Sequence, residues 1–238
     1  MRLLIFFFTF LSVLNAHFLA LLPTTDVVES KKDSILEIKA MFIHPFEQSG
    51  MDLEKLDGLF VNGEPLEQKE FKNFGHRAFK ADFKVDKPGL YTFYATPKYY
   101  FEPLEDLFLR HYPKVIVSGY GIEDGWDEPV GLPYEIVPLV KPFGIYAGNL
   151  FQGRVLQNGK LAPNTLVEVE FYNDLGVSAP TNAHITQSVM SDDFGVFSFV
   201  PIHKGWWGFT AIIMDGEKEL NGKKYEVENG ATIWIKAY

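Results

Sequence analysis

The stretch "SILEIKAMFIHPF" at residues 34–46 alternates between apolar and polar side chains. Its apolar face comprises Leu36, Ile38, Ala40 and Phe42, and Glu37 and Lys39 lie on the opposite face. A period of two residues is typical of a β-strand with one face buried. His44 continues the apolar face at the end of this strand, so the pattern directs an imidazole toward a hydrophobic core.

The rest of the chain repeats this pattern in short segments separated by turn signals. Alternating or aromatic runs occupy residues 76–85, 87–97 and 105–121, and more follow residue 144. Asn62-Gly63 and Asn158-Gly159 each predict a two-residue hairpin turn. No segment has a convincing helical period. Short strands with frequent turn signals predict an all-β protein with two β-sandwiches.

Residues 119–144 differ in composition, because they are dense in Gly, Pro and acidic residues. A segment of this length predicts a connection between two domains that packs partly on one of them. We therefore expect an N-terminal β-sandwich at 17–118 and a C-terminal one at 145–238. In "GWWGF", Trp206 and Trp207 fall on opposite faces of one strand, which predicts that at least one lies in a core or a domain interface.

The N-terminus has the pattern of a signal peptide. Arg2 supplies a positive charge, "LLIFFFTFLSVL" is apolar, and Ala16 stands where a signal peptidase prefers a small residue. The apolar run is shorter than the roughly 20 residues that span a bilayer. We expect residues 1–16 to be removed, which would export the protein to the periplasm with His17 as its first residue.

The composition of the chain argues against several classes of function. The chain has 238 residues, a formal net charge of -9 and no cysteine. An acidic protein repels phosphate backbones, so no nucleic-acid partner is expected. The lack of cysteine excludes disulfides, thiolate metal sites and a cysteine nucleophile. Because the common catalytic motifs are also missing, we expect a protein that is not an enzyme.

Several longer stretches resemble known families. "GRVLQNGKLAPNTLVEVEF" and "SDDFGVFSFVP" resemble the transthyretin-like or Cna-B-like small sandwich, and the first half is expected to be immunoglobulin-like. The whole chain resembles the additional periplasmic component of nickel energy-coupling-factor transporters, a family once catalogued as a domain of unknown function. The matching stretches are "AHFLALLP" (16–23), "HPFEQSGM" (44–51), "KPGLYTFYATPKYYFEPLEDLFLRHYPK" (87–114), "GWDEPVGLPYEIVPLVKPFGIYAGNLFQGRV" (125–155) and "GWWGFTA" (205–211). This resemblance implies an exported protein that supplies membrane nickel transporter subunits.

Histidines are the candidate metal ligands, because imidazole suits nickel, copper and zinc. A mature N-terminal His17 would offer its α-amine and its ring nitrogen in one chelate. His44 and His111 lie on the apolar faces of their strands and are the expected partners, with Glu102 as a completing carboxylate. The alternative is that both histidines are ordinary core residues and that Glu102, Glu105 and Asp106 form a solvated turn.

The other histidines are expected to lie outside this site. His76 is expected in solvent near a turn, with a fourth-ligand role as the alternative, and His184 and His203 are assigned to the structure of the second sandwich.

The expected function is reversible binding of a divalent metal, Ni(II), and its presentation to the membrane importer. One alternative is a copper-handling protein with the same N-terminal histidine, since Cu(II) outbinds Ni(II) at nitrogen sites. The other is a structural or interaction module that binds no metal. A neighbouring importer gene would separate this last alternative from the expected nickel function.

Overall fold

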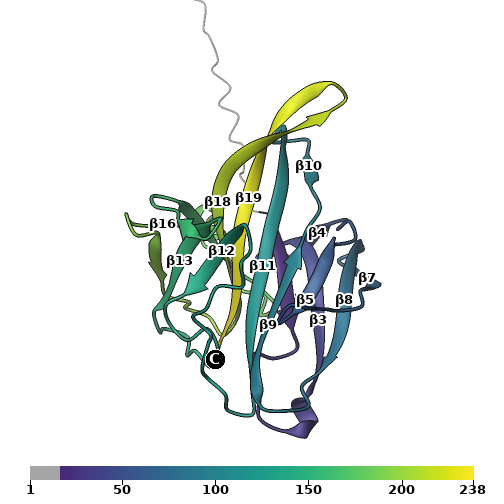
Figure 1. Ribbon diagram of the computed structural model, residues 1–238. Helices are drawn as coiled ribbons and strands as arrows, with labels where there is room; N and C mark the ends of the chain where they lie inside the picture. The colour runs from purple at the N-terminus through teal and green to yellow at the C-terminus, as the bar shows by residue number, and fades with distance from the viewer. Residues whose placement is uncertain (1–16) are drawn as a thin grey trace, which may run out of the picture.

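The computed structural model describes residues 17–238, so the expected signal peptide at 1–16 lies outside the described residues. In the described part the fold is all-β, with no α-helix and two short 3-10 turns at Lys31–Asp33 and Asn182–His184. Three sheets form a pair of β-sandwiches, as the alternation predicts (Figure 1). Residues 17–238 contain no helix with the length and apolar character needed to cross a membrane.

The first sheet carries the stretch that opens the sequence analysis. Its strands, in order, are β1 (Phe18–Pro23), β3 (Ile35–His44), β8 (His76–Lys84) and β7 (Lys69–Asn73), and β4 (Ser49–Met51) also pairs with β3. Burial alternates along β3 from Ile35 to Ala40 and is continuous from Ala40 to Ile43, and the element is the predicted strand. His44 is its last residue.

The second sheet has ten strands and runs through both halves of the molecule. Its order is β16 (Gln187–Met190), β15 (Leu166–Phe171), β18 (Gly205–Leu220), β19 (Lys223–Ala237), β11 (Leu107–Gly119), β9 (Gly89–Thr96), β5 (Gly58–Val61) and β6 (Glu64–Pro65). Two short strands, β2 (Val27–Val28) and β10 (Tyr100–Glu102), also pair with β11. Strands β11 and β19 are parallel neighbours, from Phe108 opposite Val227 to Val115 opposite Trp234.

The third sheet covers the C-terminal half. It contains β12 (Tyr134–Pro138), β13 (Phe151–Gln157) and β14 (Lys160–Leu161), and β17 (Val196–Phe199) pairs with β13. Separate hydrophobic cores lie under the first and the third sheet, and the ten-stranded sheet contributes residues to both. The two sandwiches therefore share one central sheet.

The predicted hairpin turns are present. Asn62 and Gly63 join β5 to β6, and Asn158 and Gly159 join β13 to β14, all four with positive φ. Positive φ at both central residues is what a type I′ turn needs, and Asn-Gly adopts it most readily.

The segment 119–144 is more ordered than the sequence suggests. It contains β12, which pairs with β13 from Tyr134 opposite Gln157 to Pro138 opposite Gly153. Glu135 of this strand forms a fully buried ion pair with Lys114 of β11, with 2.5 Å between Nζ and Oε1. Burial lowers the pKa of the Lys114 ammonium, and the nearby Glu135 carboxylate opposes that shift. The expected connection is thus a strand of the third sheet, anchored to the central one, while the domain boundaries at 118 and 145 stay predictions.

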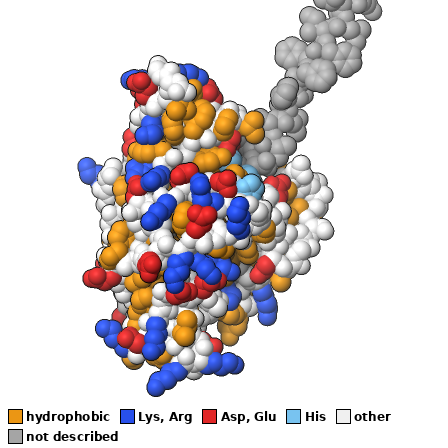
Figure 2. All heavy atoms as spheres, turned by 90° about the vertical axis from the view of Figure 1, so that its right-hand side faces the viewer, with side chains coloured by type: hydrophobic (Ala, Val, Ile, Leu, Met, Phe, Trp, Pro, Cys, Tyr) orange, Lys and Arg blue, Asp and Glu red, His pale blue; other side chains and the backbone are white. Residues whose placement is uncertain are grey.

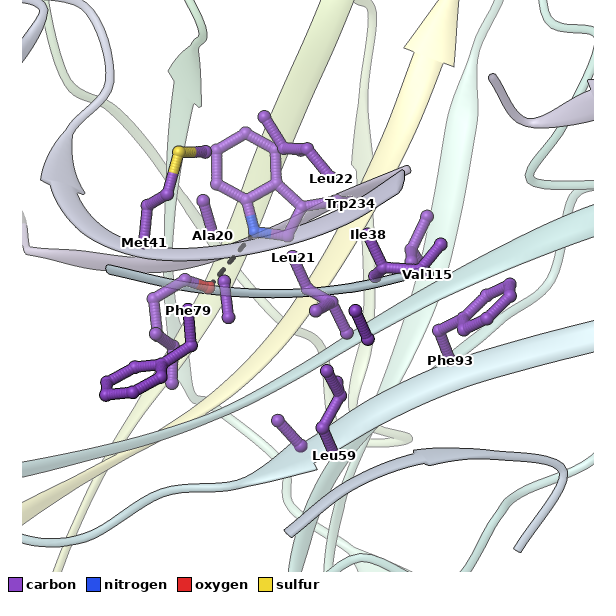
Figure 3. Close-up of a cluster of buried hydrophobic side chains, with 14 of the residues drawn as sticks. Ala20, Leu21, Leu22, Ile38, Met41, Leu59, Phe79, Phe93, Val115 and Trp234 are labelled. Carbon is purple, nitrogen blue, oxygen red and sulfur yellow. Dashed lines mark hydrogen bonds between the residues drawn. The ribbon is translucent and has the colours of Figure 1, made fainter. Parts of the chain in front are cut away.

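Tryptophans join the two cores. Trp206 lies in the N-terminal core and Trp207 in the C-terminal core, so the alternation of "GWWGF" places both inside. Trp234, near the end of the chain, is fully buried in the N-terminal core. Its indole N–H donates to the backbone carbonyl of Leu19 at 3.2 Å, and its ring meets that of Phe18 edge-on at 5.9 Å, within the cluster that Figure 3 shows.

Replacing Trp234 tests this link between the last long strand and the first. Trp234→Phe should lower the free energy of unfolding by about 2 kcal/mol, because it leaves a void and strips the buried Leu19 carbonyl of its donor. Denaturant unfolding of the two proteins measures the loss. Trp126→Phe, in a half-buried loop position, is the matched control and should cost less than about 1 kcal/mol. Equal losses in the two variants would contradict the proposed link.

Candidate metal centre

Two of the predicted histidines meet where β1 and β3 pair. The register sets Phe18 opposite Ile43, so His17 and His44 lie opposite each other one residue further along. Their ring centroids are 4.7 Å apart, with an angle of 54° between the planes. Pairing of the two strands therefore brings together imidazoles that are 27 positions apart in the sequence.

Carboxylates face both nitrogens of the His17 ring. Glu102, buried at the end of β10, has its Oε2 3.2 Å from Nε2, and Glu105 has its Oε1 3.9 Å from Nδ1. Burial, together with smaller electrostatic contributions from His44 and His111, lowers the pKa of His17 to about 3. At neutral pH His17 is consequently an uncharged imidazole, so its contact with Glu102 is not an ion pair between two charged groups.

His111 lies deeper, on β11, and is 3% exposed. Its Nε2 is 3.1 Å from Oε1 of Glu228 on β19, whereas its Nδ1 has no hydrogen-bond partner among residues 17–238. Gly230 lies opposite His111, and a Cβ there would come within 2.5 Å of the imidazole, so glycine makes room for the ring. The Phe42 ring lies 5.7 Å from that of His17 and 6.4 Å from that of His111.

Further acidic groups belong to the same region. Burial raises the pKa of Glu168, on β15, to about 7, and the negative charges of Glu228 and Glu105 act in the same direction. The pKa of Glu105 is also raised, first by burial and then by Glu228 and Glu102. We call this group the histidine–carboxylate cluster; its members are His17, His44, His111, Glu102, Glu105, Glu168 and Glu228.

The structure thus gathers all four predicted site residues, His17, His44, His111 and Glu102, in one region. Glu168 and Glu228 were not predicted from the sequence as members of this site. The alternation of β15 and β19 shows which residues share a face of the strand, but it does not show that both faces are covered. Figure 2 shows histidine and acidic side chains together at the surface. Within residues 17–238, however, no three His, Asp or Glu side chains converge in an arrangement that could hold a metal ion as they stand.

The remaining histidines lie outside the cluster. His76 is exposed at the start of β8, with Nδ1 3.7 Å from Oδ1 of Asp52, which agrees with the expected solvent position. His184 and His203 belong to the C-terminal half and line a cavity there.

The raised pKa of Glu168 predicts a pH-dependent stability. A carboxyl group with a pKa near 7 in the fold and 4.5 otherwise stabilises the fold below pH 4.5, and this contribution is lost as the pH rises through 7. Glu168→Gln mimics the protonated form, so relative to the parent protein it should gain about 2 kcal/mol between pH 5 and pH 8. Denaturant unfolding at the two pH values measures this gain, with Glu226→Gln at an exposed position as control. If the free energies of unfolding of Glu168→Gln and the parent changed in parallel with pH, the raised pKa of Glu168 would be contradicted.

Comparisons with solved structures find distant likenesses to this chain. Similar solved structures include the D0-D1 domain of intimin, with 10% identity, 93% of this chain and 100% of that chain covered, and a TM-score of 0.25. A protein from Corynebacterium diphtheriae described as membrane anchored has 14% identity, coverage of 92% and 58%, and a TM-score of 0.26. The ICAM-5 D1-D4 ectodomain fragment has 10% identity, coverage of 92% and 47%, and a TM-score of 0.27. This chain spans less than two thirds of the last two, and likenesses this distant carry no inference about function.

A search of curated proteins finds no match. The sequence profile of DUF4198, a domain of unknown function, matches residues 14–215, which is most of the chain. The chain therefore belongs to the DUF4198 family.

Proposed function

We propose that this protein binds a divalent transition metal at the histidine–carboxylate cluster, with Ni(II) as the cargo. The observation that carries the proposal is the meeting of His17, His44 and Glu102, which come from just before β1, the end of β3 and the end of β10. Imidazole and carboxylate together, without thiolate, form a donor set suited to nickel, copper and zinc.

The protonation of His17 supports this function. Because its pKa lies near 3, the ring is neutral at physiological pH and protons do not compete for its lone pair. If export removes residues 1–16, the α-amine of His17 becomes a second nitrogen donor on the same residue. This amine titrates near 8 in model peptides, so a bound metal would displace its proton, and affinity should fall as the pH drops.

Electrostatics around the ligands favour a cation as well. Glu102 and Glu228 act on Glu105, and Glu105 and Glu228 act on Glu168, in each case as like charges that raise the pKa. A divalent cation among these carboxylates would relieve the repulsion. Since the donors do not yet converge, binding requires side-chain rotations, which the half-buried position of His17 near the surface permits.

Delivery to a membrane importer is the second part of the proposal and rests on the resemblance to the nickel transporter component. Reversible chelation suits this role, because a carrier must release its cargo and needs no covalent chemistry. The expected site of action is the periplasm.

Nickel titration by calorimetry tests the metal site. With a protein that begins at His17, His17→Ala and His44→Ala should each weaken Ni(II) binding at least about 100-fold, since loss of a ligand should cost no less than loss of an outer partner. His76→Ala is the matched control, because His76 is exposed and outside the cluster, and it should bind like the parent.

The outcomes separate the alternatives. An extra Ala before His17 should weaken binding if the α-amine is a ligand, and should change nothing if only rings and carboxylates bind. Equal affinity in His17→Ala, His44→Ala and the parent would place the metal elsewhere. A parent protein that binds neither Ni(II) nor Cu(II) would overturn the proposal and favour a structural or interaction module.

A further inference from the structure

The C-terminal half contains a cavity of about 570 Å³, which we call the aromatic cavity. Its floor is made by Phe171 of β15 and Trp207 of β18, which are register partners and are buried. Phe199 and His203 extend this aromatic surface: the Phe199 and Trp207 rings lie 5.7 Å apart, and the His203 ring is within 10° of parallel to that of Trp207. These aromatic rings line one side of a space that the protein does not fill.

The opposite wall is held in place by hydrogen bonds. It consists of residues 177–180, 184 and 185, between β15 and β16, together with Gln187 of β16 and Phe46 from the N-terminal half. Asn173, which is 8% exposed, donates to the carbonyls of Phe46 and Val177 and accepts from the N–H of Val177 at 2.7 Å. Glu170 accepts from the N–H of Phe46 at 3.3 Å. The wall is therefore built into the fold, and the cavity is preformed.

The lining defines the chemistry of a ligand. None of the residues that line the cavity is Lys, Arg, Asp or Glu. Two of its polar side chains are already engaged locally, since His184 shares a hydrogen bond with Thr181 and the Trp207 N–H donates to the carbonyl of His203. A charged ligand would find no Lys, Arg, Asp or Glu of opposite charge in this lining, whereas an apolar ring system would stack on the aromatic floor.

The volume of the cavity and the exposed apolar side chains at its rim also favour an apolar ligand. Cavities of 300–1,000 Å³ with apolar and aromatic walls are typical of small-molecule sites. At the rim, Ile202 is 67% exposed and Val200 is 38% exposed, so a bound apolar molecule would cover side chains that water now surrounds. We propose that the aromatic cavity binds an uncharged small molecule with an aromatic or bulky apolar body.

The test uses N-phenyl-1-naphthylamine, a neutral aromatic dye that fluoresces in apolar surroundings, with the full exported chain in the presence of a metal chelator. The dye should bind saturably at one site. Ile202→Asp should weaken its binding at least about tenfold, because a carboxylate would enter a lining that has no charge. This substitution is safe for folding, since Ile202 is largely exposed.

Two further variants test whether the dye binds in the aromatic cavity. Ala179→Trp, which places an indole inside the cavity, should also abolish saturable binding. Leu104→Asp removes a side chain that is 95% exposed beside the histidine–carboxylate cluster, and it should bind the dye like the parent. Absence of saturable binding in the parent, unchanged binding in Ile202→Asp, or loss of binding in Leu104→Asp would each overturn the proposal. Because the chelator removes metal, this outcome is independent of nickel binding.

Discussion

The parallel pairing of β11 with β19 is the constraint on which the rest of this structure depends. It joins the last long strand of the N-terminal half to the last strand of the chain, over eight consecutive residue pairs. The joined sheet is covered by the first sheet over one part and by the third sheet over another. Trp234 shows the consequence, since a residue of the C-terminal strand lies in the N-terminal core and donates to Leu19.

The same pairing creates the buried polar region beside that core. Along β19, the fully buried Trp234 is followed on the same face by Thr232, which shares a hydrogen bond with Thr210, then by Gly230 and Glu228. The face thus changes from apolar to acidic toward the end where His111 and His17 lie. Burying carboxylates so close together costs free energy, and the pKa values of Glu105 and Glu168 are raised for this reason.

Two buried polar groups on β11 differ in how fully they are hydrogen-bonded. Lys114 has Glu135 as its partner, and Glu135 also accepts backbone N–H groups of Val130, Gly131 and Leu132. Its hydrogen-bonding capacity is used, as a buried ion pair requires for stability. His111, three residues earlier, keeps a buried Nδ1 without a partner among the described residues, and neighbouring carboxylates repel each other. The metal binding that we propose for the cluster would give this nitrogen a partner, as buried polar atoms usually have.

The amino-acid sequence by itself determined the local structure: alternation set the strands, Asn-Gly set the hairpin turns, and the end of β3 set the position of the half-buried His44. These features depend on neighbours a few residues apart, so they can be read from the chain. It also indicated His17, His44, His111 and Glu102 as candidates, though not that they meet. Only the tertiary structure decided that Glu168 is half-buried and that Glu228 reaches His111 across 117 positions. The physical reason is that periodicity tells which side chains share a face, whereas long-range strand pairing and sheet packing decide what covers that face.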